Sequence, residues 1–245
     1  MSDFNPSTYQ ATIDQLNSGL TTLTGKLNQV MPTVQAATGH WWIPGWLADG
    51  LRWCGEKLVE IGTWVLNKLG ELLEGAAAPV MFFFRAYDWG TQIGGPASGV
   101  ASSINPSALR APLDWQGDAA NSYKAAVAGQ SPAATQVKSV SDTTVTTLLL
   151  CAGAGLAFYV ALGVILVKLI AATVAAIVAL GSVVFSWAGA ALIVEEAGVN
   201  TGLIVAAVAT LVAVQSAAAN SLVQITNAAS SQTGFPGGHW PVGTA

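Results

Sequence analysis

The side chains that could perform catalysis or bind a metal are few in this chain and widely spaced. Its two histidines, His40 and His239, have no Glu, His or Cys at the spacings that zinc ligands need, and the two cysteines lack such spacings too. Glu195 and Glu196 are adjacent, and neighbouring side chains on a helix point about 100° apart, so they cannot face each other as an acid and a base. No nucleophile elbow, phosphate loop or dinucleotide fingerprint occurs. The residues therefore predict no catalytic site, no metal site and no cofactor.

Charge is distributed very unevenly along the sequence. Charged residues make up 9% of the 245 residues, against about 25% in a typical soluble domain. Nineteen of the 22 lie before residue 143, and the remaining three are Lys168, Glu195 and Glu196. We interpret these three as charges that act in a membrane or within an assembly. Because the net charge is −4 and no basic stripe is present, nucleic acid is not an expected partner.

The first forty residues have the pattern of a long helix that pairs with another helix. Asn5 and Pro6 are typical of a helix start, and apolar side chains then recur in steps of four and three as far as Val34. The predicted helix-pairing positions of this seam are Ile13, Leu16, Leu20, Leu23, Leu27 and Val30. A stripe this narrow needs a partner helix, either within the chain or in another protein.

A second amphipathic helix is predicted over about residues 46–74, after a break rich in Gly, Trp and Pro. Trp46, Trp53 and Trp64 share one flank of this helix. These tryptophans either cover a neighbouring helix or form a belt at a membrane interface, where the amphipathic indole ring is favoured.

The most specific motif is the nonapeptide from Trp115 to Tyr123, in which a tight Trp-x-Gly turn leads into a helix of small residues and then an aromatic residue. The string resembles the signature of the WXG family of type VII (ESX) secretion substrates, through Trp115, Gly117, Ala119, Ala120 and Tyr123. Its combination with a long segment rich in Ala, Val and Gly is similar to the larger, EspA/EspE-like actinobacterial proteins of that system.

The resemblance implies a helical-hairpin corner, in which the tryptophan packs across the bend, the glycine permits the reversal and the alanines let two helices approach. It also implies a location in the cell envelope or membrane, or secretion by a Sec-independent route, and the N-terminus lacks the pattern of a Sec signal peptide. The family's export signal has an acidic residue four positions after a tyrosine, and none of the four tyrosines here fits. The resemblance thus implies that a partner supplies the signal or that the chain is not exported.

The back half of the chain is apolar enough to enter a membrane. Each charge-free run beside Lys168 exceeds the about 20 residues that a helical span requires. The polar, glycine-containing stretch 195–200 is the predicted tip of an apolar helical hairpin, with a further break near Gly181. The same composition would also suit a buried element of a soluble helical oligomer.

Together these patterns predict an all-α protein, in which a coiled-coil-like bundle of helical hairpins precedes a long, membrane-interacting apolar hairpin. The predicted segments are a heptad helix (1–38), a Trp-rich helix with an aromatic cluster (39–93), a Gly/Ser/Pro linker (94–114), the Trp-x-Gly corner and a helix (115–142), the apolar hairpin (143–227) and a disordered tail (228–245).

The leading functional hypothesis is a non-enzymatic type VII secretion-associated substrate or component. It would pair with itself or with a helical protein partner and engage membrane lipid, without a small-molecule substrate. The alternatives are a resident integral membrane scaffold or channel that uses the charges at 168, 195 and 196, and a pore-forming effector.

Overall fold

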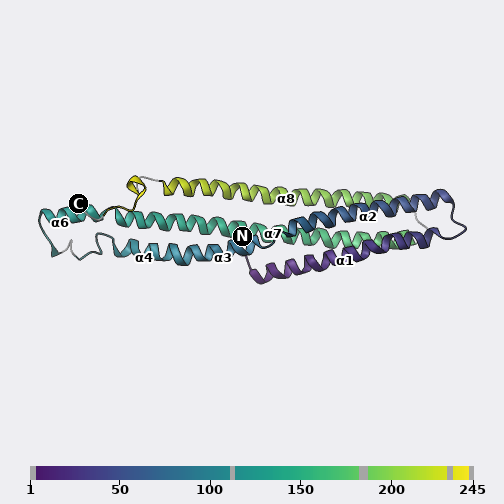
Figure 1. The fold of residues 1–245 in the computed structure, drawn as a ribbon, viewed down its shortest axis with the longest axis horizontal. Helices are drawn as coiled ribbons and strands as arrows, with labels where there is room; N and C mark the ends of the chain where they lie inside the picture. The colour runs from purple at the N-terminus through teal and green to yellow at the C-terminus, as the bar shows by residue number, and fades with distance from the viewer. Residues whose placement is uncertain (1–3, 111–113, 182–186, 231–233, 243–245) are drawn as a thin grey trace. The chain divides into compact units, whose positions relative to one another are not determined.

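The computed structural model describes residues 4–110, 114–181, 187–230 and 234–242. All regular secondary structure in these ranges is helical, which confirms the predicted all-α class (Figure 1). The chain forms two compact units: unit 1 comprises Met1–Ala78 and Ala154–Val212, and unit 2 comprises Pro79–Gly153 and Ala213–Ala245. Helices α7 and α8, defined below, each contribute one segment to each unit.

Unit 1 begins with α1 (Pro6–Thr38) and α2 (Gly45–Leu73), which lie side by side (Figure 1). The start of α1 is fixed by its cap, because the Asn5 side chain accepts hydrogen bonds from the backbone nitrogens of Ser7 (2.9 Å) and Thr8 (3.2 Å). The structure therefore places α1 over the heptad pattern and α2 over the second amphipathic pattern.

Three helices share the core of unit 1, because α7 (Gln130–Gly181) packs against α1 and α2. One buried cluster contains residues from all three: Val30, Val34, Leu51, Cys54, Leu58, Ala176 and Leu180. Glycines allow the helices to approach closely. A Cβ on Gly62 of α2 would lie 2.5 Å from a methyl of Leu27, and one on Gly19 of α1 would lie 2.6 Å from a methyl of Leu166.

In unit 2, the first part of the predicted linker 94–114 is helical as far as Ser103, and the prediction is wrong for this part. The chain forms α3 (Ala78–Asp88), a π-helical segment η1 (Trp89–Gly94) and α4 (Gly95–Ser103) before turns at 104–110. Proline is tolerated in the first turn of α4, because backbone N–H groups there have no partner within the helix. The hydroxyls of the last two serines of α4 donate hydrogen bonds to carbonyls of the preceding turn. The composition that suggested a linker is therefore compatible with a helix.

The predicted turn at 195–200 is also wrong, because α8 (Trp187–Ala229) runs through it without interruption. Glutamate is a good helix former, and one glycine inside a helix costs only about 1 kcal/mol. The remaining residues of this 43-residue helix offset that cost. The end of α7 at Gly181 coincides instead with the second predicted break. The side chains of Glu195 and Glu196 lie outside the described residues.

The tail, residues 228–245, was predicted to be disordered, yet residues 228 and 229 complete α8 and residues 234–242 pack within unit 2. Gly234 packs on the side chain of Gln136, where an added Cβ would lie 2.8 Å from the amide carbon. Pro241 packs on Gly129, and the rings of Phe235 and Trp240 lie 6.2 Å apart. The contacts of Gly234 and Pro241 join residues about a hundred positions apart, so local periodicity gave no sign of them.

Candidate functional site

The Trp-x-Gly corner is a real bend, and Gly117 is the residue that makes it. Its backbone has φ +102° and ψ −175°, a region that is essentially restricted to glycine. Helix α6 (Asp118–Val127) starts at the next residue, and the Gly117 carbonyl accepts the first helical bond from the Asn121 nitrogen at 3.1 Å. Asp118 in the first turn complements the positive end of the helix dipole.

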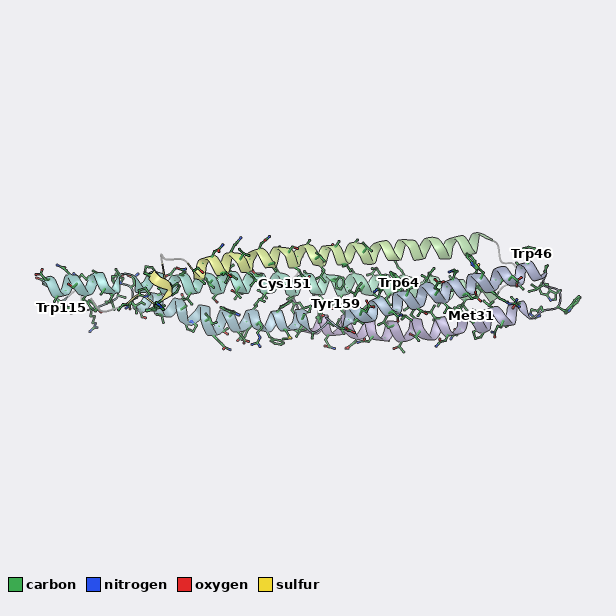
Figure 2. The ribbon with its side chains drawn as sticks, turned by 45° about the horizontal axis from the view of Figure 1, so that its top comes forward. Met31, Trp46, Trp64, Trp115, Cys151 and Tyr159 are labelled. Atoms are coloured by element: carbon green, nitrogen blue, oxygen red, sulfur yellow. The ribbon has the colours of Figure 1, made fainter. Side chains whose placement is uncertain are left out.

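The corner brings together most of the motif residues. The Trp115 ring lies 6.0 Å from the Tyr123 ring at an interplanar angle of 49°, so the indole covers the first turns of α6. Trp115 remains 44% exposed, and it stands at the bend in Figure 2. Ala120 is buried, whereas Ala119 is exposed to solvent. Only one of the two alanines therefore takes part in close packing within the chain.

The segments before and after the corner form the two arms of a helical hairpin. Two buried serines at the start of α7 join these arms: Ser131 donates to the Ala101 carbonyl at 2.8 Å, and Ser141 donates to the Trp89 carbonyl at 2.7 Å. The second bond reaches the π-helical segment, where backbone groups depart from the regular α-helical ladder. No motif or spacing in the sequence marks these serines, and sequence reasoning missed them.

The predicted pairing seam of α1 is covered by helices of the same chain. Leu16, Leu23, Leu27 and Val30 are buried, while the other two seam residues, Ile13 and Leu20, are half-buried. Leu27 contacts Gly62 of α2, and Val30 belongs to the cluster shared with α2 and α7. A second protein could pair with this seam only after α1 separates from its neighbours. The structure thus indicates that the seam serves folding within unit 1.

Two tyrosines of unit 1 donate hydrogen bonds to the C-terminal end of α2, and sequence reasoning missed this role. Tyr9 donates to the Ala76 carbonyl at 2.5 Å, and Tyr159 donates to the Leu72 carbonyl at 2.9 Å. These carbonyls lie at and just beyond the end of α2, where no helical partner is available. The two rings meet edge to face at 5.7 Å. Burial, and to a lesser degree Tyr159, raises the pKa of Tyr9, so this hydroxyl stays a hydrogen-bond donor.

An exposed apolar stripe runs along the outer face of α7. It consists of Val160, Val164, Val167, Val174 and Val178, and Ala171 fills the remaining slot, so that the steps are four and three throughout; we call it the valine stripe. The opposite face of the same helix is buried in the core of unit 1. The heptad steps of the stripe are those of a seam that another helix would cover.

Two helical segments, Asp118–Gly181 and Val208–Ala229, are long and apolar enough to cross a membrane, by length and composition alone. A third of the most apolar window in the first is buried (33%), and none of the window in the second is buried (0%). Lys168 is exposed beside the valine stripe, so its charge is solvated in this state. At the centre of a bilayer the same charge would cost roughly 2.5–3.5 kcal/mol.

The described residues offer little for catalysis. Among them, no group of three or more His, Cys, Asp or Glu side chains is placed to hold a metal ion. Cys54 and Cys151 are free thiols. Burial raises the pKa of the Cys54 thiol, which lowers its thiolate fraction and therefore its reactivity.

Comparison with protein-family models, with curated proteins and with solved structures finds no match to this chain. The fold itself defines the class: an all-α helical bundle with two segments that are capable, by length and composition, of crossing a bilayer.

Proposed function

We propose that this chain is a non-enzymatic protein of a type VII (ESX) secretion system, a substrate or component that packs with helical partners and engages a membrane. The observation that carries the proposal is the uncovered apolar surface of α7 and α8. None of the apolar window in Val208–Ala229 is buried, and the valine stripe is exposed along unit 1. Continuous apolar surface in water is unfavourable, so it indicates a site that protein or lipid covers.

The proposed mechanism is packing, with no covalent chemistry. Helices α1 and α2 cover one face of α7, and a partner helix on the valine stripe would cover the other. When the partner leaves, the same surface becomes available to lipid. The candidate pairing surface is therefore the stripe on α7, since the seam of α1 is already occupied.

The geometry of the corner supports the secretion part of the proposal. Gly117 has a backbone conformation that other residues rarely adopt, and Trp115 packs on Tyr123 across the start of α6. A second Trp-x-Gly sequence, Trp53-Cys54-Gly55, lies in the middle of α2 and makes no bend. It provides a natural reference for experiments on the corner.

Export is tested by following the chain in the culture medium of a host with a type VII apparatus and of the same host with that apparatus inactivated. We expect export only with the active apparatus, and loss of export in Trp115→Ala but not in the matched Trp53→Ala. Export that is independent of the apparatus, or equally impaired in both variants, would contradict the secretion assignment.

The alternatives are a resident membrane scaffold or channel and a pore-forming effector, and the apolar window of α7 favours either. Alkaline carbonate extraction separates a protein held by partners, which washes off membranes, from a resident span, which does not. Dye release from liposomes that decreases in Lys168→Leu would favour a pore.

A further inference from the structure

The turn between α1 and α2 exposes three tryptophans. Trp41 is 95% exposed, Trp46 is 67% exposed and Trp42, which stacks on His40, is 47% exposed. We call Trp41, Trp42, Ile43, Pro44 and Trp46 the tryptophan tip. Turns at a protein surface are ordinarily polar, and Figure 2 shows Trp46 at the tip end of α2. An indole that projects into water almost completely is unfavourable unless something covers it in another state.

The stretch of sequence that contains the tip carries no formal charge between Lys26 and Asp49. No Asp, Glu, Lys or Arg occurs from Leu27 to Ala48, and His40 is the only residue with an ionisable side chain between Lys26 and Asp49. Moving the tip out of water would therefore bury apolar surface without desolvating a carboxylate or an ammonium group, which is the costly part of such a transfer.

Two further tryptophans of α2 follow Trp46 on the same flank of the helix, but they lie among charged residues. Trp53 and Trp64 are also exposed, at 52% and 42%. The solvent face of the same helix carries three ion pairs at i,i+3 spacing: Asp49–Arg52, Lys57–Glu60 and Lys68–Glu71. Trp53 and Trp64 thus share a solvated, charged face, and they offer an internal reference for the tip.

The end of the apolar helix α7 packs on parts of α1 and α2 that lie several residues from the tip. Leu180, in its last turn, belongs to the buried cluster with Val34 and Leu51, which flank the turn. A Cβ on Gly181 would lie 3.2 Å from the Thr33 methyl group. The last turn of a helix that is apolar enough to span a bilayer therefore packs on the parts of α1 and α2 nearest the tip.

We infer that the tryptophan tip is a membrane-interface anchor, whose indoles enter the boundary between lipid headgroups and acyl chains. The inference rests on the membrane engagement of the proposed function and names the element that first contacts lipid. Tryptophan is enriched at this boundary because its ring is apolar and its N–H can remain hydrogen-bonded. A convex, projecting tip suits a soft bilayer, whereas a protein partner would need a pocket for each ring. Without basic residues, binding should depend on apolar burial and not on anionic lipid.

The test is flotation of the full chain with phosphatidylcholine vesicles at low and high salt, comparing wild type with Trp41→Ser/Trp42→Ser and with the matched control Trp53→Ser/Trp64→Ser. We expect the tip variant to lose on the order of tenfold in vesicle partitioning, the control to stay near wild type, and salt to have little effect. Circular dichroism verifies that both variants keep their helices. Brominated acyl chains should quench indole emission in the wild type and control but much less in the tip variant.

The outcomes separate this inference from the proposed function. Wild-type binding that persists in the tip variant, or that falls equally in tip variant and control, overturns the anchor while membrane engagement stands. Wild type that binds no vesicle overturns both. A tip variant that floats normally but loses a co-purifying protein would replace the bilayer with a protein as the occupant of the tip.

Discussion

The tripeptide pattern Trp-x-Gly occurs three times in the sequence, and two of its occurrences, at 53–55 and 115–117, have opposite structural results. In α2, Trp53-Cys54-Gly55 continues a helix, and Gly55 lies against Val34 of α1. At 115–117 the pattern ends a loop, and Gly117 has φ +102° with open space around it. The first glycine is needed for close helix packing and the second for backbone conformation. The structure that this motif forms thus depends on its flanking sequence. The residues around 53–55 continue an amphipathic helical pattern, whereas the residues before 115–117 interrupt such a pattern.

The largest expected effect is in the packed glycine. Gly55→Val should lower the free energy of unfolding by about 3 kcal/mol, because even a Cβ would lie 2.8 Å from the Val34 methyl and overpacking a tight contact costs about this much. Chemical denaturation measures it. The control is Gly70→Val in the same helix, where nothing lies within 4 Å of an added Cβ. Equal losses in the two variants would refute the packing role.

The bend glycine should respond next most strongly, for a different reason. Gly117→Ala should cost about 1–3 kcal/mol, since the residue lies in a region of φ and ψ that is nearly closed to other residues. Gly99→Ala in α4, which also has open space around it, should be neutral or stabilising by up to about 1 kcal/mol because alanine favours a helix. Thermal unfolding of both variants would reveal whether the signs differ.

The middle residues of the two motifs, Cys54 and Gln116, also differ in burial, and substitutions at both should differ in their effect on stability. Cys54 is buried in the core of unit 1, whereas Gln116 is exposed. Cys54→Ser should destabilise by about 1–2 kcal/mol by placing a hydroxyl among apolar side chains, and Gln116→Ser should change stability by less than about 0.5 kcal/mol. Comparable effects in denaturant titrations would mean that the two positions do not differ in burial.

The smallest effect concerns the tryptophan itself. A double-mutant cycle on Trp115 and Tyr123 should give a coupling of about 0.5–1.5 kcal/mol, as for other aromatic pairs in contact. A second cycle on Trp53 and Tyr123, which belong to different units, should give a coupling near zero. Coupling of similar size in both cycles would show that the first does not report a local contact.

Much of the helical structure could be predicted from the sequence, because the period of the apolar residues is a local property. The steps of four and three placed α1 and α2, and Asn5 marked the first cap. The Trp-x-Gly string located the bend at Gly117. What periodicity could not indicate was the partner of the α1 seam, which proved to be α2 and α7 of the same chain.

Two of the errors have a common physical origin in contacts between distant residues. The 94–114 segment was predicted as a linker from its composition, but Ser131 donates a hydrogen bond to Ala101 of α4 and Gly94 packs on Ser141. The tail was predicted to be disordered, but Gly234 and Pro241 find their contacts on and just before α7. The predicted turn at 195–200 was wrong for a different reason, because polar residues within an apolar run do not by themselves end a helix.

The notch that Gly19 makes in α1 restricts how α7 can leave its neighbours. The Leu166 methyl occupies the space that a side chain at position 19 would fill, so the two helices interlock at this point. Sliding α7 along its axis would drive that methyl into the side chains above or below the gap. Separation of α7 from α1 must therefore begin with a lateral movement that lifts the Leu166 methyl out of the gap at Gly19. Only then can α7 slide along its axis.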